Sequence, residues 1–116
     1  MNTTRLLTFI ETAPFTKRWA GKDVELARLQ SELMRDPLAG DVIQGSGGFR
    51  KYRFAGSNSG KSGSQRVIYY FFSGQSVVLL AISYAKSEKA TLNAAEKKLL
   101  AHLAHQYQAI LGRSSS

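Results

Sequence analysis

Basic and aromatic side chains in the centre and C-terminal part of the chain have types and spacings that suit RNA chemistry. Lys51 and Arg53 are two residues apart, so both lie on one face of an expected strand. Arg66 begins the next β-rich stretch, and Tyr84 and Lys86 end the one after it. Paired as adjacent antiparallel strands, these stretches bring the side chains onto one patch. Guanidinium groups bind phosphate bidentately, so this patch alone favours RNA binding over RNA cleavage.

The net charge also indicates a polyanionic partner. The chain of 116 residues has 16 Lys and Arg against 8 Asp and Glu, a formal net charge of +8. Residues 41–72 hold five basic side chains and one acidic one, whereas residues 1–40 are nearly balanced. Such a stretch favours nucleic acid or an acidic protein as partner. We expect Arg50 and Lys61 to contact the RNA backbone. Four tyrosines offer surfaces for base stacking, although several belong in the core: Tyr52, Tyr69, Tyr70 and Tyr84.

Other kinds of chemistry are excluded or disfavoured. The chain has no cysteine, which excludes disulfides, Cys-ligated metals and thiol nucleophiles. Residues 56–62 resemble a phosphate-binding P-loop, but three residues separate the glycines instead of four, and a strand follows instead of a helix. His102 and His105 have no third ligand nearby in sequence, so no metal site is expected. Scattered carboxylates and the absence of a Gly-x-Ser-x-Gly elbow disfavour glycoside and serine hydrolases.

The sequence shows no signal for membrane insertion or export. Its longest apolar run, residues 76–82, is far shorter than the roughly 18 residues of a membrane span. The N-terminus lacks the long apolar segment of a signal peptide. We therefore expect a cytoplasmic protein with one domain over residues 1–116.

Local patterns predict the elements that hold the basic patch. Apolar residues three and four apart predict a helix over residues 15–35, interrupted at Gly21 and capped again by Asp23. Asn93 and Glu96 form a capping box at the start of a C-terminal helix. Strands are predicted over residues 5–12, 49–55, 66–72 and 77–84, with turns over residues 40–48. This order predicts an α+β fold, with a small antiparallel sheet packed against N-terminal helices and a C-terminal helix.

Several segments also resemble the RelE/HigB superfamily of toxins from type II toxin–antitoxin systems. The resemblance is carried by residues 40–55, residues 60–70, the segment Tyr84-Ala85-Lys86-Ser87-Glu88, and Leu92-Asn93 at the start of the last helix. It extends in order over residues 26–105, is specific over residues 40–70, and is closest to the HigB-like branch. The fold that it implies is the same small sheet with helices.

The resemblance implies a ribosome-dependent mRNA endonuclease that cuts codons in the ribosomal A site. In this family the 2′-hydroxyl of the mRNA attacks the adjacent phosphorus, which leaves a 2′,3′-cyclic phosphate and a 5′-hydroxyl. By resemblance, Lys51 serves proton transfer or charge stabilisation, Arg53 binds phosphate, Arg66 clamps the scissile phosphate, and Lys86 adds a further basic group. The implied partners are the ribosome, mRNA and a HigA-like helix-turn-helix antitoxin, and no metal ion or organic cofactor is implied.

The chain departs from the RelE pattern at two positions. Ser87 occupies the place of a catalytic arginine, and Asn93 the place of a catalytic tyrosine. Tyr84 or Lys86 is then a candidate for the general acid or base. Two alternatives stay open on the same fold: a ParE-like toxin that inhibits gyrase, and an RNA-binding module without catalysis.

Overall fold

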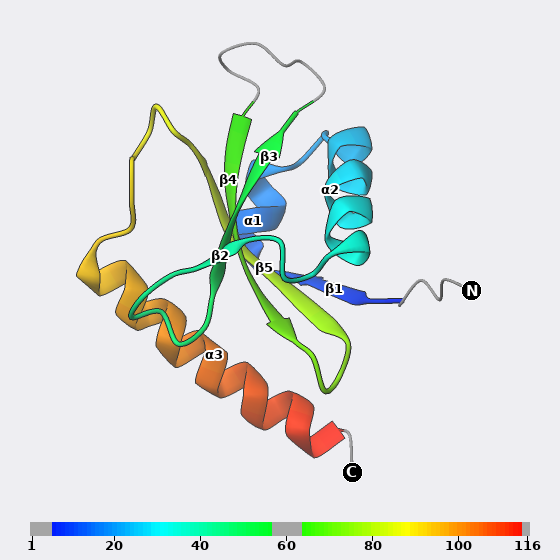
Figure 1. Cartoon of the computed structure of the whole chain (residues 1–116), viewed down its shortest axis with the longest axis vertical. Helices are drawn as coiled ribbons and strands as arrows, with labels where there is room; N and C mark the ends of the chain where they lie inside the picture. Colours follow the sequence, from blue (N-terminus) through cyan, green and yellow to red (C-terminus); the bar gives the residue numbers. More distant parts are fainter. Residues whose placement is uncertain (1–5, 57–63, 115–116) are drawn as a thin grey trace.

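Helices cover both faces of a mixed β-sheet in the computed structural model, which describes residues 6–56 and 64–114 (Figure 1). Within these ranges five strands form one sheet in the order β1-β5-β4-β3-β2. The strands are β1 (Thr8–Glu11), β2 (Asp41–Val42), β3 (Arg50–Ala55), β4 (Ser64–Phe72) and β5 (Val77–Ala85). The helices are α1 (Ala13–Arg18), α2 (Asp23–Arg35) and α3 (Ala94–Ser114).

The α+β class and the order of helices and strands are confirmed, with three differences. Strand β1 pairs with β5 in parallel, so the sheet is mixed and not wholly antiparallel. The turn-rich segment contains the short strand β2. Lys22, not Asp23, is the N-cap of α2, and its side chain makes no capping hydrogen bond. The direction of a partner strand leaves no mark on the alternation within a single strand, which is why the pairing of β1 was missed.

Helices α1 and α2 cover one face of the sheet. Helix α1 begins where the hydroxyl of Thr12 accepts a hydrogen bond from the backbone N–H of Phe15 at 3.3 Å, and Gly21, with φ of +77°, lies between the two helices. The core under these helices consists of apolar and aromatic side chains: Phe15, Trp19, Leu29, Leu33, Phe54, Val67, Tyr69, Val78 and Leu80. Side chains fill the space between this face of the sheet and the two helices.

Helix α3 packs across the opposite face (Figure 1). The predicted capping box begins it, because Asn93 Oδ1 accepts from Glu96 N at 2.8 Å and Glu96 Oε1 accepts from Asn93 N at 2.9 Å. Leu100 and Ala104 of the helix contact the apolar side chains of β4 and β5. No helix of the described residues, α3 included, is long and apolar enough to cross a membrane.

The turn between β2 and β3 is pressed against α3. Buried Ser46 donates to the carbonyl of Ile43 at 2.8 Å and accepts from Phe49 N at 3.0 Å, which holds the turn closed. Gly47 has a φ of +79°, and a Cβ there would lie 2.9 Å from the Cα of Ala101. A glycine is required at this position for both reasons, since a side chain would be strained and would push the helix away. The turn thus becomes one wall of the site described below.

Candidate active site

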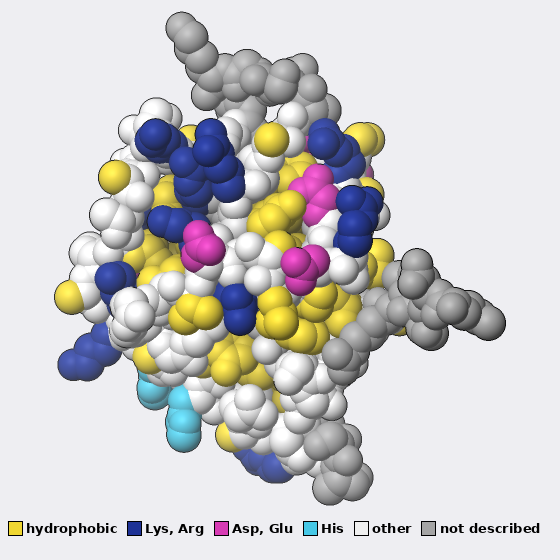
Figure 2. Space-filling model, in the orientation of Figure 1, with side chains coloured by type: hydrophobic (Ala, Val, Ile, Leu, Met, Phe, Trp, Pro, Cys, Tyr) yellow, Lys and Arg dark blue, Asp and Glu magenta, His cyan; other side chains and the backbone are white. Residues whose placement is uncertain are grey.

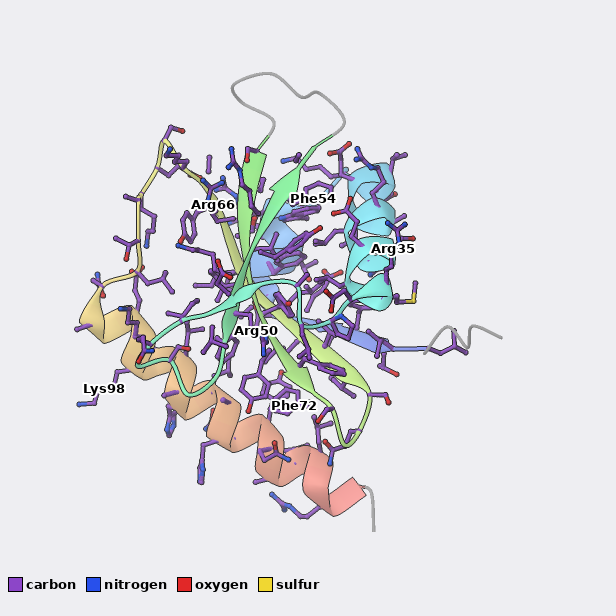
Figure 3. All side chains as sticks on the ribbon, viewed as in Figure 1. Arg35, Arg50, Phe54, Arg66, Phe72 and Lys98 are labelled. Atoms are coloured by element: carbon purple, nitrogen blue, oxygen red, sulfur yellow. The ribbon has the colours of Figure 1, made fainter. Side chains whose placement is uncertain are left out.

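Arg53, Arg66 and Tyr84 form a row across three strands. Arg53 of β3 pairs with Arg66 of β4, and Arg66 pairs with Tyr84 of β5. Side chains at paired positions lie on the same face, about 5 Å apart at their Cβ atoms. Figure 3 shows Arg66 near the start of β4, beside the segment that leads from β5 to α3. The row therefore places two guanidinium groups next to a phenol.

A β-bulge puts Tyr84 into this row. Ile68 pairs with Ile82, but Tyr69 pairs with Leu80, so Ala81 is an extra residue on β5. An extra residue reverses the alternation of side chains beyond it. As a result Tyr84 packs in the core on the α3 side, together with Ala81. Simple alternation from Leu79 would have directed Ser83 to that side instead.

Lys51 lies on the same face of the sheet as the row. It is two residues before Arg53 on β3, and its cross-strand partner on β2 is Asp41. Lys51, Asp41 and Tyr84 all line a pocket of about 280 Å³ between β2, β3, β5 and the start of α3. Thus Lys51, Arg53, Arg66 and Tyr84, predicted from sequence to share a patch, do lie on one face of the sheet.

Tyr84 is the most buried member of this group. Its side chain is 5% exposed, and its hydroxyl has no hydrogen-bond partner among the described residues. Burial raises the pKa of the phenol, while the charges of Lys89 and Arg66 act in the opposite direction. Tyr84 therefore carries its proton at neutral pH, and a buried hydroxyl of this kind gains by meeting a ligand atom.

Lys89 and Glu96 hold the segment between β5 and α3 close to Tyr84. The ammonium of Lys89 lies 5.6 Å from the centre of the Tyr84 ring and forms an ion pair with Glu96. The hydrogen bond from Lys89 lowers the pKa of the Glu96 carboxyl, with a further contribution from Asn93 N. The capping box predicted the position of Glu96, but no local pattern pointed to Lys89.

Arg18 holds the other end of the same segment. Its guanidinium makes two hydrogen bonds to the carboxylate of Glu88, one of them at 2.9 Å, and a third to Gln65 Oε1 at 3.3 Å. Glu88 in turn accepts from Ala85 N at 2.6 Å, and these bonds, that from Arg18 first, lower its pKa. The segment from β5 to α3 is thus tied to helix α1 as well as to α3.

Two of the basic residues predicted as site residues stand apart from the row. Arg50 lies on the opposite face, where its Nη1 donates to the carbonyls of Gly40 at 2.7 Å and Leu38 at 3.2 Å. Lys86 is exposed in the turn that follows β5. Lys61 lies outside the described residues. Figure 2 shows Lys and Arg side chains gathered on this side of the molecule, near the end of β3 and the start of β4.

Three of the four tyrosines suggested for base stacking have structural partners. Tyr69 is fully buried, donates to the carbonyl of Pro37 at 2.7 Å and accepts from Gly40 N at 3.0 Å. Tyr52 donates to the carboxylate of Glu32, and burial together with that bond raises the pKa of Tyr52 to about 12. Tyr70 packs against two phenylalanine rings. Tyr84 alone of the four has a buried hydroxyl without a hydrogen-bond partner in the described part of the chain.

Comparisons with known proteins show the family and the fold. A family model described as the RelE toxin of the RelE / RelB toxin-antitoxin system matches residues 11–114. A solved structure of E. coli toxin RelE, a double arginine-to-alanine mutant in the free state, matches with a TM-score of 0.53 and 13% sequence identity. That match covers 74% of this chain and 90% of that chain, and at this identity it shows a shared fold.

Proposed function

Because the chain belongs to the RelE toxin family, we propose that it is a ribosome-dependent endoribonuclease that cuts mRNA in the A site and so stops translation. The observation that supports this proposal is the row of Arg53, Arg66 and Tyr84 with Lys51 beside it, all on one sheet face. Cleavage needs a proton removed from the 2′-hydroxyl, a stabilised phosphorane and a proton delivered to the leaving 5′-oxygen. The row contains groups suited to each of these tasks.

The two arginines suit the phosphate. Paired guanidinium groups stay charged and donate several hydrogen bonds to phosphate oxygens, so they stabilise the extra negative charge of the phosphorane. Arg66 is half-buried between β3 and β5, whereas Arg53 is exposed, so Arg66 is the better preorganised of the two. We therefore propose that Arg66 binds the scissile phosphate and that Arg53 makes a second contact with the same phosphate.

Tyr84 suits the leaving group. Burial keeps the phenol protonated at neutral pH, so it can donate a proton to the 5′-oxygen as the phosphorus–oxygen bond breaks. Lys51 stabilises the negative charge that develops on the 2′-oxygen and, in its neutral amine form, accepts the proton that the 2′-hydroxyl releases. The bond from the 2′-oxygen to phosphorus forms as the bond to the 5′-oxygen breaks, giving a 2′,3′-cyclic phosphate and a 5′-hydroxyl. Lys86 remains a further basic group at the edge, and no metal ion or cofactor takes part in the proposed reaction.

The finer assignments are part of the same proposal. The segments at residues 40–70 favour the HigB-like branch of the family, and with it a HigA-like helix-turn-helix antitoxin that holds the toxin inactive. Because translating ribosomes are the site of action, the proposed location is the cytoplasm. Arg50 is bonded to backbone carbonyls on the far face, so we give it a structural role and leave RNA contact to the row and to Lys61.

Expression of an Arg66→Ala variant tests the proposal. The wild-type chain should arrest growth and produce new mRNA 5′ ends inside codons, mapped by primer extension, whereas Arg66→Ala should do neither. Arg35→Ala is the matched control, because it removes the same charge from the exposed surface of α2. Arrest with intact mRNA and damaged DNA would instead support the ParE-like alternative. A folded Arg66→Ala variant with full toxicity would contradict the assignment of the scissile phosphate.

A further inference from the structure

A pocket beside the row of arginines has the composition of a recognition site. It measures about 280 Å³ and lies between β2, the turn that follows it, β5 and the start of α3. Its lining includes the polar side chains of Asp41, Gln44, Lys51, Tyr84, Thr91 and Lys97, and Leu92 is among its apolar residues. The volume is just below the range of about 300–1,000 Å³ that is typical for drug-sized ligands, so it suits one planar ring system.

One carboxylate in this pocket is left for a ligand. Asp41 is exposed and forms no ion pair with any described residue, although its cross-strand neighbour is Lys51. Lys51 and Lys97 line the same pocket and are half-buried, so the pocket also contains hydrogen-bond donors. The carboxylate and the two ammonium groups together indicate a ligand with its own donors and acceptors.

We propose that this pocket binds one unstacked base of the cleaved RNA, and that it selects bases with an exocyclic amino group over uracil. A carboxylate accepts hydrogen bonds only, so Asp41 recognises the amino group of adenine, cytosine or guanine. Lys51 and Lys97 donate to the ring nitrogen or carbonyl oxygen beside that amino group. Uracil has no amino group, and the one donor on its pairing edge, N3–H, lies between two carbonyl oxygens that repel the carboxylate.

The position of the pocket determines which nucleotide of the RNA supplies the bound base. Lys51 belongs both to the pocket lining and to the face with Arg53 and Arg66, and neighbouring strands are about 4.8 Å apart. A phosphate held by the arginines therefore lies within one nucleotide of the pocket. The proposal rests on the proposed cleavage of RNA, and it adds that the base next to the cut is read by this chain as well as by the ribosome.

Nucleotide binding by the intact protein tests the pocket without any cleavage. In NMR titrations with AMP, CMP, GMP and UMP, the amide signals of Asp41, Gln44 and Leu92 should shift, and UMP should bind about fivefold more weakly, the effect of one hydrogen bond. Asp41→Asn should remove that difference, because an amide both donates and accepts. Asp23→Asn, on exposed α2, is the control for the change in charge. Equal binding of all four nucleotides, or shifts confined to other residues, would overturn the proposal.

A second variant separates this inference from the proposed function. Gln44 is exposed at the pocket, so Gln44→Trp fills the space without disturbing the core. The Gln44→Trp and Asp41→Asn variants should still cut mRNA, but the depletion of uracil next to the cut should disappear. If the wild type and these variants cut with the same base preferences, the pocket has no such role, while the proposed nuclease function stands. If the wild type cuts no RNA, the proposed function fails, and the titrations still decide whether a base binds here.

Discussion

Arg18 and Glu88, separated by 70 residues, form a two-point ion pair that ties the end of α1 to the segment between β5 and α3. Lys89 and Glu96 tie the same segment to α3. The segment follows Tyr84 directly, and Lys89 lies over the Tyr84 ring. These two ion pairs therefore set the position of the groups around the proposed proton donor.

Breaking the first ion pair should loosen the segment and leave the sheet intact. We expect Glu88→Gln to raise amide hydrogen exchange over residues 86–93 and to slow RNA cleavage, with little change in the cooperative unfolding transition, because both partners are partly exposed. The exchanged pair, Arg18→Glu with Glu88→Arg, should restore much of the protection and the activity. Unchanged exchange in Glu88→Gln would show that the ion pair does not hold the segment.

Stability should fall in acid through the same carboxylates. The pKa values of Glu88 and Glu96 are lowered below the usual 4.5, mainly by hydrogen bonds from Arg18 and Lys89. A carboxyl with a lowered pKa in the folded state stabilises the fold above pH 4.5 and loses this contribution as the pH falls through its own lower value. Urea unfolding between pH 7 and pH 3 should show the loss. The Glu88→Gln, Glu96→Gln double variant should have a shallower pH dependence, and an unaltered one would contradict this origin.

Tyr84→Phe should separate activity from stability. Loss of the proposed proton donor should slow cleavage by about 10²-fold or more. The same change removes a buried hydroxyl without a partner among the described residues, so the free energy of unfolding should be equal or about 1 kcal/mol higher. Single-turnover cleavage on programmed ribosomes and urea unfolding measure the two effects. A stability loss of several kcal/mol would mean that the hydroxyl is bonded within the protein.

Gly47→Ala should destabilise the wall of the pocket. The backbone at Gly47 has a positive φ, and the added methyl group would press on Ala101 of α3. We expect a loss of about 1–3 kcal/mol in the free energy of unfolding. Gly74→Ala is the matched control, because a Cβ there meets no atom within 4 Å. Equal stability of the two variants in urea would show that the turn and the helix are free to move apart.

Much of the fold was predictable because its elements depend on local patterns. The period-two alternation of Lys51 and Arg53, the interruption at Gly21 and the capping box of Asn93 and Glu96 each involve neighbours in sequence, and all three hold in the structure. The parallel pairing of β1 was not predictable, since the direction and identity of a partner strand depend on the path of the whole chain. The ion pairs of Arg18 and Lys89 were missed for the same reason.

The sequence by itself determined the chemistry that is present: an excess of positive charge, paired basic residues at strand spacing, no thiols, and the segments that place the chain in its family. Only the tertiary structure decided which of those groups meet. The extra residue Ala81 turns Tyr84 toward Arg66, and strand pairing sets Arg66 beside Arg53. The physical reason is that residue type and spacing follow the chain, whereas a site is made of contacts across strands, and a single bulge changes which side chains share a face.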